Sequence, residues 1–132
     1  MNIVAGTPPN FEAIVARFPA ARRRGVIFTW GDTVYVNGVP ELPSQLKAHE
    51  AVHIDQQRRL WGGPERWWAL YLDNPTFRLD QELQAHRAEY RTLKQLDRNA
   101  AARSLTFIAE RLASPLYGGM ITVREAKRMI LA

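Results

Sequence analysis

The stretch Ser44–Trp61 reads SQLKAHEAVHIDQQRRLW, and it decides how the rest of the chain must fold. On a helix, ~100° of rotation per residue gathers six of its side chains onto one face: Leu46, His49, Glu50, His53, Gln57 and Leu60. The apolar ends of this face predict that it is buried. Its middle, however, carries two imidazoles and a carboxylate, and burying a neutral polar group unpaired costs ~2–7 kcal/mol, a charge more. Something in the fold must therefore satisfy these side chains.

Within the stretch, His49-Glu50-Ala51-Val52-His53 forms the motif HExxH. Two imidazoles four residues apart on a helix both reach one zinc ion at ~2.0–2.1 Å, whereas the Glu between them is directed to a metal-bound water. The alternative interpretation is a pair of structural histidines. We predict that His49 and His53 are metal ligands and that Glu50 is a general base.

A catalytic zinc site needs a third protein ligand, and the absence of cysteine excludes a thiolate. A helix predicted over residues 76–98 offers Glu82, His86 and Glu89, spaced four and three apart beside an apolar stripe. Glu82 lies at the inner margin of the stripe, and we predict that it is the third ligand. We expect His86 nearer the centre of the stripe, and Glu89 as a solvated or salt-bridged surface residue.

The flanking sequence predicts an α+β fold that is mostly helical. Gly31-Asp32 separates two β-branched runs and predicts a β-hairpin just before the HExxH helix. Thr122 and Glu125 form a capping box before a final helix. The expected elements, within a single domain spanning 1–132, are helices 11–18, 44–61, 64–73, 76–98, 99–113 and one after 122, with strands 26–30 and 33–36.

The stretch Glu82-Leu83-Gln84-Ala85-His86 is similar to the Glu-x-x-Ala-Asp of gluzincin metallopeptidases, in which a Glu on a later helix is the third zinc ligand. His86 stands where the family often has an Asp that bonds to a metal-ligating His. More narrowly, residues 26–120 resemble small HExxH proteins of phages and prophages. Gln56 after the motif and the segment Ser114–Gly118 carry this likeness too. The resemblance implies a compact zincin-like domain, a Zn²⁺ cofactor and proteolytic ancestry.

The mechanism expected from these residue types is metal-assisted hydrolysis of a peptide bond. Zinc lowers the pKa of its water to ~7, and Glu50 would take the proton and return it to the leaving amine. Tyr117 is a candidate donor to the oxyanion, although a Tyr in such a turn is more often packing. His86 is a candidate for support of a ligand or for direct catalysis. We also expect one hairpin strand at the rim of the site, where it would pair with an extended peptide.

The remaining aromatic side chains of this region could line a substrate groove, but at helical spacing they are more often core. This expectation covers Trp61, Trp67, Trp68 and Tyr71.

The chain has a formal net charge of +5, with 18 basic and 13 acidic residues. Its arginines are spread beside acids along every predicted helix, as on a solvated surface, so a nucleic-acid partner is disfavoured. No signal peptide or membrane span is expected, which predicts a cytoplasmic or virion-associated protein.

Two functions remain open. The first is a zinc metallopeptidase that acts on a protein or on a peptide of a cell-wall polymer such as peptidoglycan. The alternative is a non-catalytic structural or interaction protein, for instance a component of a phage particle or of its assembly, that retains a zincin scaffold.

Overall fold

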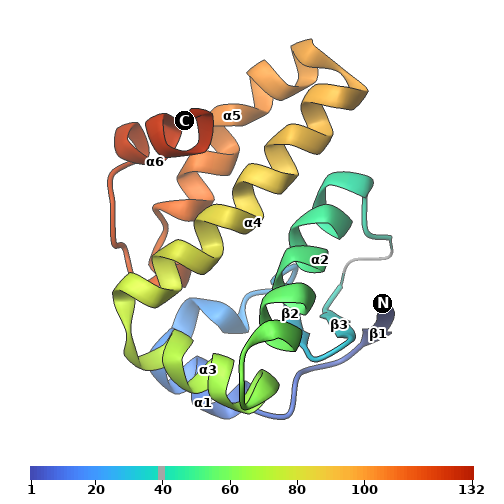
Figure 1. The fold of residues 1–132 in the computed structure, drawn as a ribbon, viewed down its shortest axis with the longest axis vertical. Helices are drawn as coiled ribbons and strands as arrows, with labels where there is room; N and C mark the ends of the chain where they lie inside the picture. The colour runs from blue at the N-terminus through green and yellow to red at the C-terminus, as the bar shows by residue number, and fades with distance from the viewer. Residues whose placement is uncertain (39–40) are drawn as a thin grey trace.

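The computed structural model describes residues 1–38 and 41–132. These residues form an α+β fold, as predicted, in which helices predominate (Figure 1). The helices are α1 (Phe11–Arg17), α2 (Ser44–Arg59), α3 (Gly63–Asp73), α4 (Pro75–Leu96), α5 (Arg98–Leu112) and α6 (Val123–Leu131), with 3₁₀ turns η1 (Pro19–Arg22) and η2 (Pro115–Tyr117). The strands are β1 (Asn2–Ala5), β2 (Phe28–Trp30) and β3 (Thr33–Val36).

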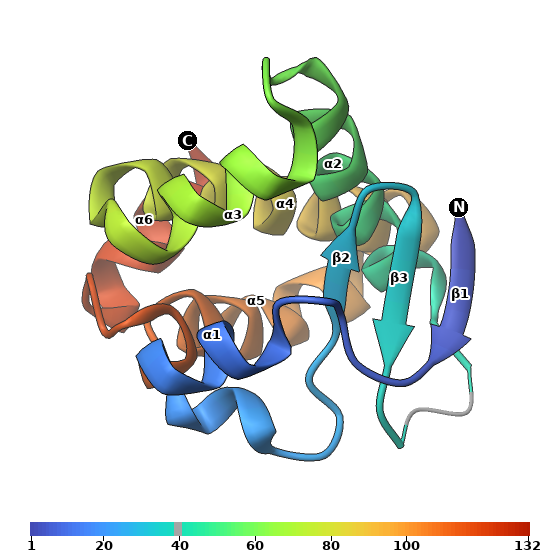
Figure 2. The same ribbon diagram turned by 90° about the horizontal axis from the view of Figure 1, so that it is seen from below.

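The predicted hairpin is present, and the sheet holds one strand more. β2 pairs antiparallel with β3, with Thr29 opposite Val34. β1 pairs parallel with the other side of β3, so the strand order is β1-β3-β2 (Figure 2). Sequence patterning did not predict β1, because all four of its residues are exposed and its backbone partners lie about thirty residues away. β2 is therefore an edge strand, and it faces the helices.

Two caps fix the ends of helices near the predicted positions. The side chain of Asn74 accepts a hydrogen bond from the backbone N–H of Phe77 at 3.0 Å and starts α4. Thr122 Oγ1 accepts from the backbone N–H of Glu125 at 3.1 Å, which confirms the capping box before α6.

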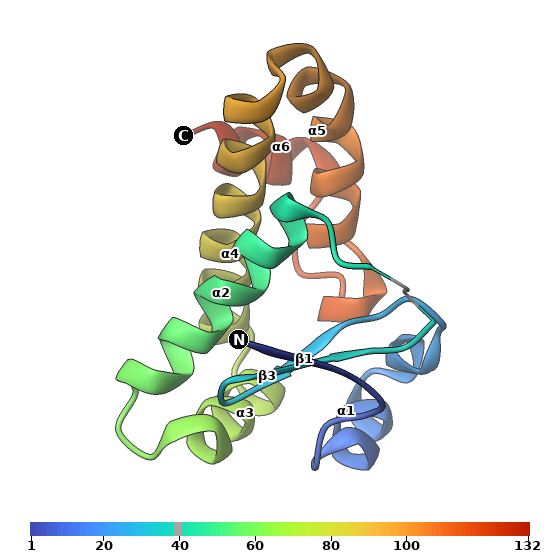
Figure 3. The same ribbon diagram turned by 90° about the vertical axis from the view of Figure 1, so that its right-hand side faces the viewer.

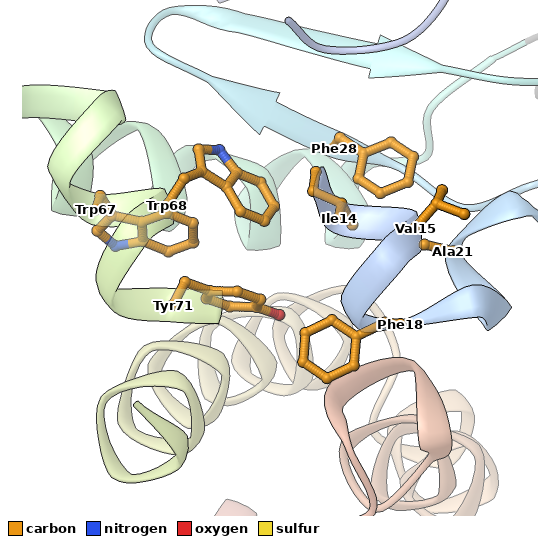
Figure 4. Close-up of a cluster of buried hydrophobic side chains, with 8 residues drawn as sticks. All are labelled: Ile14, Val15, Phe18, Ala21, Phe28, Trp67, Trp68 and Tyr71. Carbon is orange, nitrogen blue, oxygen red and sulfur yellow. The ribbon is translucent and has the colours of Figure 1, made fainter. Parts of the chain in front are cut away.

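The apolar core has two parts. In the first, Trp67, Trp68 and Tyr71 of α3 face apolar side chains of α1 and β2, chiefly Ile14, Phe18 and Phe28 (Figure 4). The second lies between α4, α5 and α6 and is built from Leu83, Ile108, Ala109, Leu112, Ala126 and Ile130.

The expectation that Trp61 belongs to the core is wrong. Its side chain is 83% exposed, and its ring lies against the guanidinium of Arg66 at 5.6 Å. The reason is local, because α2 ends at Arg59 and the chain turns before α3 begins. Helical spacing therefore does not carry Trp61 onto the face shared by Trp67, Trp68 and Tyr71, all of which are buried.

α2 lies alongside α4, and the contact between them is polar (Figures 1 and 3). The buried side chains of α2 are all polar, and α4 buries further polar side chains on the side that faces α2. We call this set the polar seam: His49, Glu50, His53, Gln57, Gln81, Glu82, His86 and Glu89.

Arg78 contradicts the expectation of solvated arginines, because it is 1% exposed. Its guanidinium donates to the backbone carbonyls of Tyr71 and Tyr117, both at 2.7 Å, and so ties α3 to η2. Among the described residues, no helix is both long and apolar enough to cross a membrane.

Candidate metal centre

The HExxH motif on α2 and Glu82 on α4 converge at one point of the polar seam. The Nε2 atoms of His49 and His53 lie 3.2 Å apart. The two oxygens of the Glu82 carboxylate lie 3.5 Å from them, Oε2 from His49 and Oε1 from His53. The sequence-predicted ligands thus form a buried group whose donor atoms are close enough to hold one metal ion.

The hydrogen bonds of both imidazoles direct their Nε2 lone pairs at this common point. His49 Nδ1 lies 3.1 Å from a Glu89 carboxylate oxygen, which can only accept, so Nδ1 carries the proton. His53 Nδ1 lies 2.9 Å from Gln56 Oε1. The Gln56 amide is oriented by its Nε2, which donates to the backbone carbonyl of Gln81 at 3.1 Å. Both tautomers inferred from these partners leave Nε2 as the metal-binding atom.

The spacing and chemistry of this group fit zinc. Four tetrahedral ligands at ~2.0–2.1 Å from Zn²⁺ stand about 3.3 Å from one another. The two Nε2 atoms here lie 3.2 Å apart, and each lies 3.5 Å from a different oxygen of the Glu82 carboxylate. In addition, Glu82 Oε2 is buried without a hydrogen-bond partner among the described residues. A buried acceptor in that position is costly unless a cation or proton satisfies it.

Electrostatics in the seam attract positive charge to the same point. Burial opposes the charged form of His49, but the adjacent carboxylates of Glu82 and Glu89 outweigh it and raise its pKa to about 10. Burial also opposes ionisation of Glu82, yet His53 and His49 hold the pKa of its carboxyl well below its usual range. The group therefore demands a cation, which a proton or a metal ion can supply.

Tyr71 supports Glu82, a role that the sequence did not suggest. Its hydroxyl donates to Glu82 Oε1 at 2.6 Å. Burial and the nearby Glu82 raise the pKa of Tyr71 well above its usual value, so the phenol keeps the proton that it donates.

Glu50 is buried in the motif but does not belong to the ligand group. Its carboxylate accepts a hydrogen bond from Thr29 Oγ1 on β2 at 2.6 Å. The hairpin expected at the rim of the site is thus in direct contact with the proposed general base.

Side chains from two helices occupy part of the free edge of β2. Gln57 Nε2 donates to the Thr29 carbonyl at 2.8 Å, while its Oε1 accepts from the Gly31 N–H at 2.7 Å. Trp68 Nε1 donates to the same carbonyl at 2.9 Å. These bonds fix β2 over the seam and occupy the backbone at Thr29 and Gly31.

The prediction that Glu89 is a solvated surface residue is wrong. It is 3% exposed, and it accepts hydrogen bonds from His49 Nδ1 and from the guanidinium of Arg111 on α5. The expected salt bridge exists, but it is part of the site. Glu89 thus fills the role that the gluzincin resemblance places at position 86, one helical turn earlier. Its spacing of seven from Glu82 was the available signal, because seven residues return a helix to the same face.

His86 lies at the centre of the seam, with 0% exposure and no hydrogen-bond partner for either ring nitrogen among the described residues. Nδ1 is 3.4 Å from Glu89, and Nε2 is 3.8 Å from Glu82. Burial and the neighbouring His49 lower its pKa to about 4, so the ring is neutral. Its place between the two carboxylates suits support of the ligands.

His49, His86 and Glu89 form a second group of ligand-type atoms. Its carboxylate already bonds to Arg111, and His49 directs its protonated nitrogen toward it. This group therefore resembles a hydrogen-bonded support more than a second cation site.

A cavity of ≈330 Å³ opens onto the candidate ligands His49, His53 and Glu82, which we call the metal group. His49, Glu50, His53 and Glu82 line it together with Tyr117. The carbonyl of Tyr117 is held by Arg78, and its ring packs edge-on against His86 at 5.7 Å between centroids. Apolar residues from α1, α3, β2 and η2 complete the walls.

Comparisons of this chain with protein-family models, curated proteins and solved structures gave no match.

Proposed function

We propose that this protein is a zinc-dependent peptidase that hydrolyses a peptide bond in the cavity above the polar seam. The observation that supports this most is the convergence of His49, His53 and Glu82: the two Nε2 atoms lie 3.2 Å apart, and each lies 3.5 Å from one oxygen of the Glu82 carboxylate. These three residues would hold the ion. When bound, Zn²⁺ would supply a Lewis acid that activates water near neutral pH and polarises a carbonyl.

The residues of the chain would then handle the proton and the substrate. Glu50 opens onto the cavity beside the metal group and would accept a proton from water and return it to the leaving amine. Thr29, which donates to one Glu50 oxygen, would fix the carboxylate in place. Tyr117 lines the same cavity, and we retain it as the proposed donor to the oxyanion. We place His86 behind the ligands as a positioning residue.

The proposed substrate is a peptide or protein chain, with the peptide of a cell-wall polymer as one form of it. An extended chain would pair with the backbone of Ile27, just before β2, because Gln57 and Trp68 occupy the Thr29 carbonyl and the Val26 N–H donates to the Arg23 carbonyl. The phage-particle partners implied by the resemblance stay a prediction.

The test is Glu50→Gln, compared with the exposed Glu110→Gln as a matched control. We expect one equivalent of zinc in both variants by elemental analysis. Hydrolysis of fluorescein-labelled casein and of a mixture of quenched peptides should fall ~10²- to 10⁴-fold in Glu50→Gln alone, which is the usual contribution of a general base. Loss of zinc in Glu50→Gln would show that Glu50 is a ligand. Zinc binding by a wild-type protein that hydrolyses neither probe would favour the non-catalytic alternative.

A further inference from the structure

Much of the cavity wall beyond the metal group is apolar. Trp68 and Tyr71 of α3 stand on one side, and Ile14, Phe18 and Phe28 stand on the other (Figure 4). A substrate group that enters between them loses contact with water on both sides. The cavity therefore favours a large apolar side chain next to the site of reaction.

Two arginines of the loop before β2 line the same cavity. Arg23 and Arg24 are exposed, and neither forms a salt bridge with any residue that the structure describes. The neighbouring Arg22, in contrast, pairs with Glu12 at 3.2 Å. The third arginine of the lining, Arg111, bonds to Glu89. Arg23 and Arg24 thus present two positive charges without a counter-charge at the wall of an apolar cavity.

The backbone around these arginines is fixed. The Gly25 N–H donates to the Asn37 carbonyl at 2.8 Å, which ties the loop to the end of β3. Gly38 has φ +74°, and a Cβ at that position would lie 2.2 Å from Arg24 Nε. The Arg24 side chain therefore runs directly across the glycine backbone. A side chain that lies along the backbone in this way has fewer conformations to lose when it binds a ligand.

We propose that the substrate carries a carboxylate close to a large apolar side chain, and that Arg23 and Arg24 bind this carboxylate. The proposal rests on the peptidase function above. A guanidinium offers two parallel N–H donors that match the two oxygens of a carboxylate. The carboxylate comes from an Asp or Glu side chain or from the C-terminus of a peptide.

Binding is tested in the full-length, zinc-loaded Glu50→Gln protein, so that turnover does not interfere. Three peptides that share a central Phe are compared by calorimetry: one with Glu after it and an amidated end, one with Gln and an amidated end, and one with Gln and a free C-terminus. We expect one or both carboxylate peptides to bind about tenfold more tightly than the neutral peptide, as one charge-assisted hydrogen bond allows. The preferred peptide identifies the source of the carboxylate.

Arg23→Gln/Arg24→Gln should abolish this preference and leave weak binding of the neutral peptide. The control is Arg98→Gln/Arg103→Gln, which removes the same charge from exposed positions of α5 outside the cavity. Arg24→Lys keeps the charge and the stem over Gly38 and should retain part of the preference, which guards against a folding defect in the double variant. Equal binding of all three peptides, or an equal loss in the control, would overturn the proposal. A protein that hydrolyses peptides without this preference refutes only the arginine proposal, whereas one that shows the preference but hydrolyses nothing refutes only the peptidase.

Discussion

The two faces of α4 are built from opposite kinds of side chain. Toward α5 and α6 the helix buries Leu83 among Ile108 and Leu112, and each such side chain contributes ~1.5–3 kcal/mol to the stability of the fold. Toward α2 it buries Glu82, His86 and Glu89, each of which costs free energy unless its partners are supplied. The same helix thus joins a face that stabilises the protein to one that does not.

The hydrogen bonds of the seam orient the three proposed ligands. Glu89 orients His49, Gln56 orients His53, and Tyr71 bonds to Glu82. Each of these partners is not itself a proposed ligand but forms a hydrogen bond with one, as expected for residues that hold a metal site in a defined geometry. The apolar face carries no such arrangement, so the two faces should respond differently to substitution.

The largest effect that we expect comes from removing a residue of the metal group. Glu82→Ala removes one of the three proposed ligands, and its zinc affinity should fall by more than the ~10- to 100-fold typical of residues behind the ligands. Affinity is measured by competition with a chromophoric chelator. The matched change is Leu112→Ala on α5, in the cluster that packs against the apolar face of α4; it should lower the free energy of unfolding by ~2–5 kcal/mol yet still bind one equivalent of zinc. A three-histidine site would be indicated if His86→Ala abolished binding while Glu82→Ala left it intact.

An intermediate effect is expected at Glu89. Its removal frees the His49 ring and unpairs Arg111, so Glu89→Ala should lower zinc affinity ~10- to 100-fold. Glu89→Gln keeps an oxygen that can accept from His49, and its loss should be smaller. Glu110→Ala, on the exposed side of α5, is the control. Unchanged affinity in Glu89→Ala would mean that the hydrogen bond to His49 does not bear on metal binding.

The sequence predicted the features that depend on residues close together in the chain. α2, α3 and α4 lie within two residues of their predicted bounds, because caps and prolines next to them define their ends. The convergence of His49 and His53 was predictable because a four-residue spacing fixes the relative position of two side chains on a helix.

Contacts between distant segments were not predictable in the same way. β1 forms only because it can pair with the edge of β3. Arg78 can be buried because its guanidinium donates to two backbone carbonyls that lie far apart in the chain. The hydrogen bond from Tyr71 to Glu82 likewise depends on how α3 packs against α4. The spacing placed Glu89 beside Glu82 and His86, but it could not show that Arg111 on α5 completes its hydrogen bonds.

The smallest effect, and the sharpest test of the comparison between the two faces, is expected at His86. Its ring is fully buried and neutral, and neither nitrogen has a hydrogen-bond partner among the described residues, so it contributes packing but no compensated polar bond. Replacing such a group by an apolar one of similar size is nearly neutral or stabilising. His86→Leu should therefore change the free energy of unfolding of the zinc-free protein by less than ~1 kcal/mol in chemical denaturation, far less than Leu112→Ala on the opposite side.

The zinc affinity of His86→Leu should fall less than that of Glu82→Ala, because the ring lies 3.8 Å from the Glu82 carboxylate, beyond a direct hydrogen bond. A loss of stability as large as that of Leu112→Ala would show that His86 bonds to Glu82 or Glu89 in solution. The polar seam would then stabilise the fold in the same way as the apolar face, and the contrast between the two sides of α4 would disappear.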